Sequence, residues 1–138
     1  MTENSIKSII AVVGGFLSYY LGGVNTLLTA LITLMVLDYI SGVVAAWFEK
    51  QLNSAIGFKG IVRKVMMLIL VAVAVQIDIV AGTNGVTRAA VICFLLANEG
   101  LSILENLTRM DIGVPPIIRD ALQALKKKGD SKNTDAPG

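Results

Sequence analysis

The sequence predicts an all-α membrane protein: a bundle of four transmembrane helices, with three as the alternative, followed by a short amphipathic helix. Three observations predict this fold. Hydrophobic residues make up 54% of the 138 residues and charged residues only 16%, whereas soluble domains carry about 25% charged residues. The mean hydropathy is +0.71. Four apolar segments each approach the roughly 20 residues that a helix needs to cross a bilayer.

These apolar segments form one expected transmembrane domain, residues 1–110, and the length leaves no room for a separate soluble catalytic domain. The second segment is the clearest because it carries a single charge, whereas the first is rich in glycine. Turns containing glycine join the segments into helical hairpins, and a longer polar connection joins the middle two. No segment alternates as a membrane barrel strand does. The expected helices cover residues 6–24, 27–48, 61–81 and 86–106.

The C-terminal region is more polar than the rest of the chain. Pro115 and Pro116 can end one element and open the next, and apolar residues then recur at helical spacing up to Leu125. We therefore expect residues 111–125 to form an amphipathic helix at the membrane surface. Residues 126–138 are polar and uneven in charge, so we expect them to form a disordered cytoplasmic tail.

The basic residues predict the orientation in the membrane. Most of the 12 lysines and arginines lie around the connection between the second and third segments or after the fourth, and such residues favour the cytoplasm. Four crossings then place both termini inside and only Arg88 outside. Three crossings place the first segment outside or along the surface, together with Lys7. The residues expected to set topology or contact lipid are Lys50, Lys59, Arg63, Lys64, Lys126, Lys127 and Lys128.

Polar residues within the apolar segments are the candidate functional positions. Asp38 lies near the middle of the second segment, where a carboxylate costs roughly 2.5–3.5 kcal/mol on insertion scales. The fourth segment carries a polar stripe that faces either a pore, another subunit or a helix of the same monomer. Gly42 and Ala46 form a small-residue pair that permits close helix packing. The candidates for gating, pore lining or helix packing are Asp38, Gly42, Ala46, Asn98, Glu99, Ser102, Glu105 and Asn106.

Asp78 and Arg88 lie on either side of a predicted turn, and we expect them to form a structural ion pair.

Other features of the sequence exclude several functions. Histidine is absent and Cys93 is the single cysteine, which excludes an internal disulfide and a thiol/imidazole metal site. The chain shows no phosphate loop and no nucleophile–base pair. We therefore expect no enzyme activity, no cofactor and no nucleic-acid partner.

Three stretches connect the chain to a known family. Residues 37–42 place an Asp ahead of a Gly inside a membrane helix, residues 53–60 lead through Arg63-Lys64 into the next helix, and residues 98–106 precede a Gly-Val-Pro-Pro sequence. In this order and spacing they resemble the toxin-secretion/phage-lysis holins, a group that includes holins associated with clostridial toxin release. The resemblance covers about residues 31–125.

The resemblance implies a phage-encoded, multi-pass protein of the host bacterial inner membrane. Holins of this kind accumulate, homo-oligomerise and then open lesions that release endolysin, or a toxin, so that the host lyses at a set time. The implied partners are further copies of the chain and membrane lipid, with endolysin only indirectly. The main alternative is a small four-helix transporter or ion channel using membrane-embedded carboxylates. Residues 6–24 contain no acidic residue, which counts against the small multidrug transporters. A structural membrane subunit without a pore is the third alternative.

Overall fold

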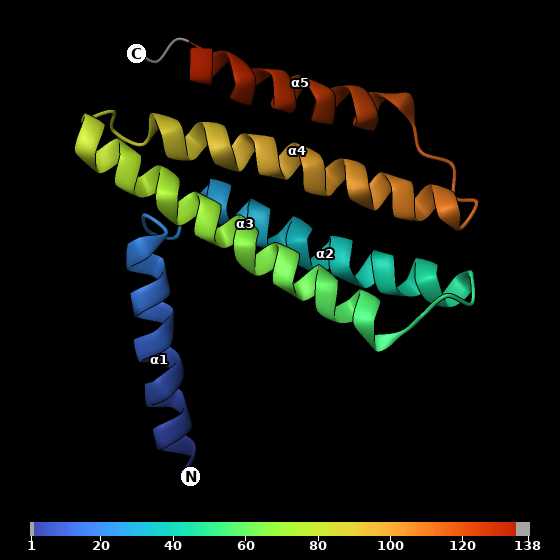
Figure 1. Ribbon diagram of the computed structural model, residues 1–138, viewed down its shortest axis with the longest axis horizontal. Coiled ribbons are helices and arrows are strands. Elements are labelled where there is room, and N and C mark those ends of the chain that lie inside the picture. The colour runs from blue at the N-terminus through green and yellow to red at the C-terminus, as the bar shows by residue number, and fades with distance from the viewer. Residues whose placement is uncertain (1, 135–138) are drawn as a thin grey trace.

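The computed structural model describes the backbone of residues 2–134 and the side chains of residues 2–130. All regular structure in this part of the chain is helical, as the composition predicts (Figure 1). The five helices are α1 (Glu3–Tyr20), α2 (Thr26–Phe48), α3 (Ser54–Ala81), α4 (Val86–Arg109) and α5 (Pro116–Thr134).

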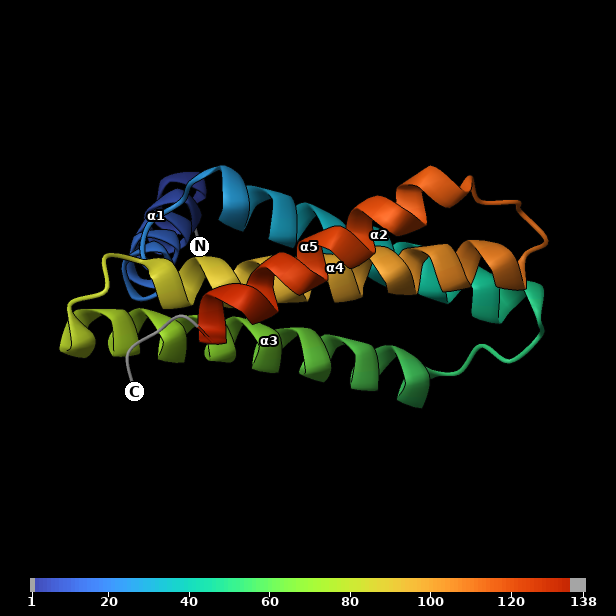
Figure 2. The ribbon, with the colours of Figure 1, turned by 90° about the horizontal axis from the view of Figure 1, so that it is seen from above.

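Three helices, α2, α3 and α4, are long and apolar enough to cross a membrane. They lie side by side in both views of the ribbon (Figures 1 and 2). The fold is therefore a helical membrane protein, and three of the four expected spans are present. The segment at residues 6–24, expected as a fourth crossing, is not among the candidate spans within the described residues.

Local sequence signals explain where the spans begin and end. The side chain of Asn25 accepts a hydrogen bond from the Leu28 backbone N–H at 3.0 Å, and that of Asn53 accepts one from Ile56 at 2.9 Å. Both are helix N-caps. The second cap starts α3 at Ser54, earlier than the expected start at residue 61, and shortens the α2–α3 connection to Glu49–Asn53. Gly82 ends α3 with a φ of 69°, which glycine adopts without steric cost.

The core lies where α4 packs against α2 and α3. Its fully buried side chains include Leu31, Val71 and Ile92. Cys93 on α4 is also buried and forms no disulfide. The outward faces of α2 and α3 leave many large apolar side chains exposed, which a soluble protein would not tolerate but lipid covers. Examples are Val36, Leu37, Ile40, Val65, Met66, Ile69 and Val73.

Helix α5 packs along α4 and does not stand apart from the bundle (Figure 1). Gly100 gives room to Leu122, because a Cβ at Gly100 would lie 2.6 Å from a Leu122 methyl carbon. Gly129 likewise lies against the Ala90 carbonyl, 2.9 Å from where its Cβ would be. The helix continues to Thr134. The expected disordered tail therefore does not begin at residue 126, and residues 135–138 lie outside the described part of the chain.

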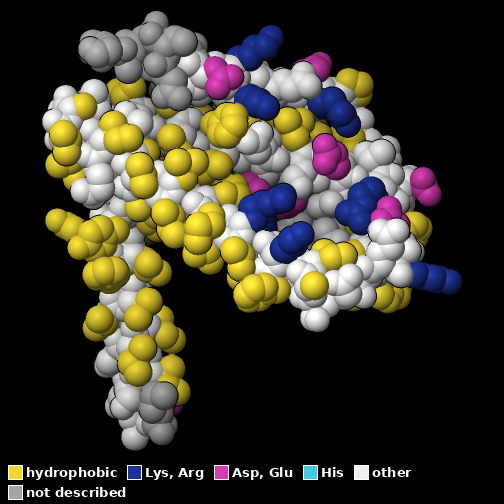
Figure 3. Space-filling model, viewed as in Figure 1, with side chains coloured by type: hydrophobic (Ala, Val, Ile, Leu, Met, Phe, Trp, Pro, Cys, Tyr) yellow, Lys and Arg dark blue, Asp and Glu magenta, His cyan; other side chains and the backbone are white. Residues whose placement is uncertain are grey.

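Helix α1 differs from the others because none of its residues is buried. It leaves the bundle at the end that carries the α3–α4 turn and runs across the direction of the three spans (Figures 1 and 2). The surface in Figure 3 shows the charged side chains gathered toward the opposite end of the bundle. The two ends of the molecule are thus chemically distinct.

Candidate functional site

Three charged side chains, one from each span, meet inside the bundle. The ammonium nitrogen of Lys64 on α3 lies 2.7 Å from Asp38 Oδ2 on α2 and 2.5 Å from Glu99 Oε2 on α4. Their side chains are 14%, 13% and 6% exposed, in the order Lys64, Asp38 and Glu99. We call these three residues the central ionic cluster. It connects all three candidate spans through charge-assisted hydrogen bonds.

The cluster sits at one depth on all three helices. Asp38 lies ten residues before the end of α2 at Phe48, and Lys64 lies ten residues after the start of α3 at Ser54. Glu99 likewise lies ten residues before the end of α4 at Arg109. At 1.5 Å per residue this is about 15 Å from the helix ends, or roughly half of a 30 Å hydrocarbon layer. Hairpin geometry therefore brings the three residues together at one depth, near the middle of α2 and α4 and about a third of the way along α3.

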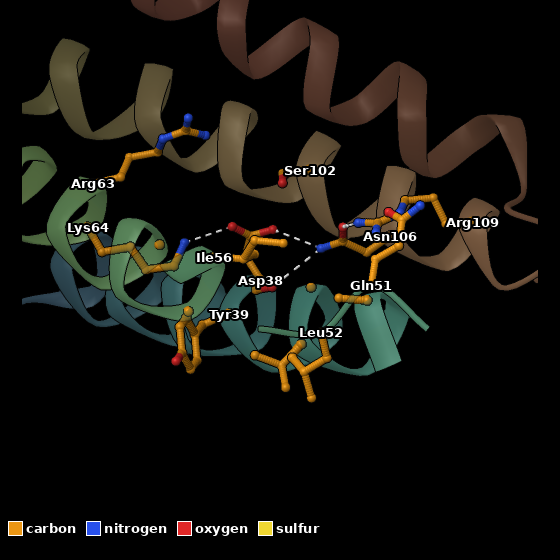
Figure 4. Close-up of a pocket in the computed structure, with 15 residues that line it drawn as sticks. Asp38, Tyr39, Gln51, Leu52, Ile56, Arg63, Lys64, Ser102, Asn106 and Arg109 are labelled. Carbon is orange, nitrogen blue, oxygen red and sulfur yellow. Dashed lines mark hydrogen bonds and ion pairs between the residues drawn. The ribbon is translucent and has the colours of Figure 1, made fainter. Parts of the chain in front are cut away.

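Asn106 extends the cluster toward the α2–α3 connection. Its Nδ2 donates to Asp38 Oδ1 at 3.2 Å and to Ser41 Oγ at 2.9 Å. Arg109 Nη1 then donates to Asn106 Oδ1 at 3.3 Å, and the same guanidinium forms two hydrogen bonds with the Glu49 carboxylate. Figure 4 shows the part of this chain of contacts that runs from Lys64 through Asp38 and Asn106 to Arg109. It joins α2 to α4 from mid-bundle to the helix ends.

A cavity of about 180 Å³ lies beside this chain of contacts. Asp38, Gly42, Ala46, Ser102 and Asn106 contribute to its walls. A polar site of this volume has room for several water molecules, since one occupies about 30 Å³ of the liquid. Gly42 and Ala46 contribute no large side chain to these walls, which leaves the space beside Asp38 open.

The charge balance makes the cluster sensitive to its surroundings. With all three groups ionised, two carboxylates face one ammonium and the net charge is −1. Burying ions away from water is expensive, and removing one partner of a buried pair typically costs 3–5 kcal/mol.

Outside the spans, the Arg109 hydrogen bond lowers the pKa of Glu49 below its ordinary value. The Glu49 carboxylate therefore stays ionised to a lower pH than an unpaired glutamate.

The α3–α4 turn carries a second polar arrangement, which corrects one expectation. Asp78 and Arg88 are neighbours, but their side chains do not form the expected ion pair. The Asp78 carboxylate accepts hydrogen bonds from the backbone N–H of Thr87 at 2.9 Å and of Arg88 at 2.8 Å. Asp78 therefore caps the N-terminus of α4, where a negative charge is favoured. The carboxylate thus accepts from backbone N–H groups that the first turn of a helix leaves without intrahelical partners.

The Arg88 guanidinium turns instead to the loop between α1 and α2. Its Nε donates to the Leu21 carbonyl at 2.7 Å, and Nη2 donates to the Gly23 carbonyl at 2.8 Å. Gly22, with a φ of 84°, lies between them, and a Cβ there would meet the guanidinium at 2.8 Å. This contact attaches the end of α1 to the α3–α4 hairpin.

The structure separates the residues of the expected polar stripe. Glu99 and Asn106 take part in the hydrogen bonds described above, and Ser102 lines the cavity. Asn98 is half-buried, and Glu105 is exposed on the surface of the molecule. The residues of the expected stripe therefore do not all share the same surroundings.

Lys64 was predicted only to set topology or contact lipid, but its ammonium group lies between two buried carboxylates. The equal spacing from the helix ends could have identified it, because Asp38 and Lys64 stand at mirrored positions in the α2–α3 hairpin. Lys126 lies over the Phe94 ring at 5.6 Å. The others are exposed, and Arg63 also borders the cavity; they are Lys50, Lys59, Arg63, Lys127 and Lys128.

Comparison with known proteins places the chain in a family. Residues 15–127 match the model of the bacteriophage holin family. An uncharacterized protein of Listeria innocua is 45% identical over 120 residues, covering 86% of each chain. A protein of Bacillus phage phi105 described as a probable holin is 39% identical over 113 residues, covering 82% of this chain and 84% of that one.

An uncharacterized protein of Clostridium perfringens is 31% identical over 128 residues, covering 92% of this chain and 95% of the other. No solved structure matches the chain. The family match covers most of the chain, including the three spans and the whole central ionic cluster. The chain belongs to the bacteriophage holin family.

Proposed function

We propose that this chain is a phage holin that homo-oligomerises in the bacterial inner membrane and opens lesions through which endolysin reaches the cell wall. Membership of the holin family supports this role and favours a membrane protein without catalytic activity. The central ionic cluster is the structural observation that carries the proposal. Three charges at mid-membrane depth are poorly suited to a passive anchor.

The cluster suits helices that exchange polar partners. In the single chain, Lys64 neutralises much of the charge of Asp38 and Glu99, so the closed bundle can remain in lipid. In an assembly the same groups can pair between neighbouring copies or face water, where the penalty for separated charges is small. Loss of the pairing within one chain then becomes favourable once enough copies surround a water-filled space.

The outer face of α5 supports a water-filled space next to the bundle. This helix runs beside a span, yet its exposed side chains include Arg119, Asp120, Lys127 and Asp130. Charged groups within a membrane face the protein interior or water and not lipid. In our proposal, α5 stays on α4 where its charged face borders the lesion.

We further propose that the α2–α3 connection and the end of α4 lie in the cytoplasm. Lys50, Lys59 and Arg109 lie at that end of the bundle and Arg88 lies at the other, which is the distribution that the positive-inside rule favours. The three spans then place the C-terminal end of α4 inside and the start of α2 outside. This differs from the cytoplasmic N-terminus expected for four crossings.

Inducible expression in bacteria, with and without a co-expressed endolysin, tests the proposed function. We expect growth to stop abruptly after a delay, the membrane potential to collapse, and lysis to require both proteins. An intact potential at high membrane levels of the chain would contradict the proposal. Collapse of the potential without lysis by the endolysin would favour the ion-channel alternative.

A further inference from the structure

Helix α1 presents an apolar surface that no other part of the described chain covers. None of its residues is buried, although it contains long aliphatic and aromatic side chains. It runs across the spans and not along them (Figures 1 and 2). It is therefore not packed as a fourth member of the bundle, and its apolar side chains need another environment.

The side chains of α1 separate into two faces. Apolar residues recur at three- and four-residue steps, which places them along one side of a helix. The other side carries mostly polar or small residues, including Lys7, which pairs with Glu3 at 2.6 Å, Ser8 and Ser18, with Val12 and Tyr19 along one edge. The apolar face consists of Ile6, Ile9, Ile10, Val13, Phe16, Leu17 and Tyr20, all of which are exposed.

Aromatic rings gather at the end of α1 that adjoins the bundle. The rings of Phe16 and Tyr20 lie 4.7 Å apart, and those of Tyr19 and Tyr20 lie 5.2 Å apart. Tyrosine is enriched where hydrocarbon meets the lipid headgroups, because one end of its ring is apolar and the other is polar. This end of α1 thus has the composition of an interfacial anchor.

The depth of that end is fixed by the α3–α4 hairpin. Arg88 holds the carbonyls of Leu21 and Gly23, while Asp78 holds the backbone of Arg88. These contacts place the start of α2 beside the α3–α4 turn. At this turn α3 and α4 leave the hydrocarbon layer. A helix that departs sideways from this level lies along the membrane surface.

We infer that α1 lies in the outer interface of the membrane, with its apolar face in the lipid and its polar face in water. The partner of this surface is the lipid bilayer itself, bound by apolar burial along the length of the helix. The inference rests on the proposed membrane placement of α2, α3 and α4, but it does not require that the chain form lesions.

Cysteine labelling of the full-length chain tests this inference. Single cysteines are placed on the polar face, at Ser8 and Ser18, and on the apolar face, at Ile9 and Val13, in a Cys93→Ala background. A membrane-impermeant maleimide is added to right-side-out spheroplasts before growth stops. We expect both polar-face variants to be labelled from outside. Both apolar-face variants should react at least about tenfold more slowly, because their thiols face lipid.

Three outcomes would overturn the inference. Labelling of the Ser8→Cys variant only after the membrane is permeabilised would show that α1 crosses the membrane. Equal labelling of all four variants would show that neither face contacts lipid. Rapid oxidative dimerisation of the Ile9→Cys and Val13→Cys variants would show that a second copy covers the apolar face. Lysis assays on the same variants separate these outcomes from failure of the proposed function, because labelling is measured before lysis begins.

Discussion

Replacing Lys64 by methionine tests the energetic role of the central ionic cluster. Methionine keeps much of the length and apolar contact of the lysine stem but removes the ammonium group. Asp38 and Glu99 then lose a partner at 2.7 Å and one at 2.5 Å. Because the side chains are at most 14% exposed, little solvent screening compensates. Removing one partner of a buried ion pair costs roughly 3–5 kcal/mol, and we expect a destabilisation in this range.

The loss of stability is measured by the decrease in helical circular dichroism during denaturant titration in mild detergent. Lys59→Met is the matched control, because Lys59 is exposed near the start of the same helix. Surface substitutions of this kind usually change stability by about 0.5 kcal/mol or less. A triple variant, Lys64→Met with Asp38→Asn and Glu99→Gln, should recover about half of the loss or more, because no charge is left buried without a partner.

Lysis timing gives a second readout of the same change. A bundle weakened by the Lys64→Met substitution should open earlier than the original chain at equal membrane amounts. If Lys64→Met is as stable as Lys59→Met, or if the triple variant is the least stable of all, the cluster does not hold the three spans together. Either result would refute the reasoning.

Three other predictions concern the carboxylates, the α5 contact and acid stability. Replacing either carboxylate of the central ionic cluster by its amide removes the surplus negative charge, so lysis at matched expression should be delayed; unchanged timing for both would exclude a gating role. Gly129→Ala should separate the end of α5 from α4, at a cost of about 1–3 kcal/mol, and tryptic cleavage of α5 should then be faster. The control Gly14→Ala, whose Cβ would have nothing within 4 Å, should leave the rate of cleavage unchanged. The lowered pKa of Glu49 means that its pairing stabilises the fold above the ordinary glutamate pKa and that this contribution is lost as the pH falls through the lower, folded-state pKa. Arg109→Gln should abolish that part of the acid dependence of thermal unfolding, and an unchanged pH profile would show that the pair adds nothing.

The spans could be predicted from sequence because their apolar runs are long and their ends carry strong local signals. The positions of α2, α3 and α4 follow the predicted segments closely, apart from the earlier start of α3 at the Asn53 cap. The first segment was harder, because its apolar residues fill one face of a helix of nearly sufficient length. The helix that forms, Glu3–Tyr20, is not among those long and apolar enough to cross a membrane, and it runs across the direction of the bundle.

Side-chain partners were less predictable than helices. Asp38 and Glu99 could be identified as candidates because a carboxylate within an apolar run is conspicuous. Lys64 resembled a topology signal, since it lies near other basic residues at the start of a span. The Arg88 contacts depend on a loop far away in sequence, and the end of α5 depends on the absence of a side chain at Gly129. Both are tertiary effects without a local sequence signal.

Escape of a folded cytoplasmic enzyme tests the central claim most directly. The enzyme's activity is measured outside spheroplasts that express the chain without endolysin, together with the membrane potential of the same cells. Lesions that pass endolysin must also pass a marker enzyme of similar size, so we expect its activity to appear outside as the potential collapses. Collapse of the potential with all the enzyme retained would contradict the account and leave a channel for small ions.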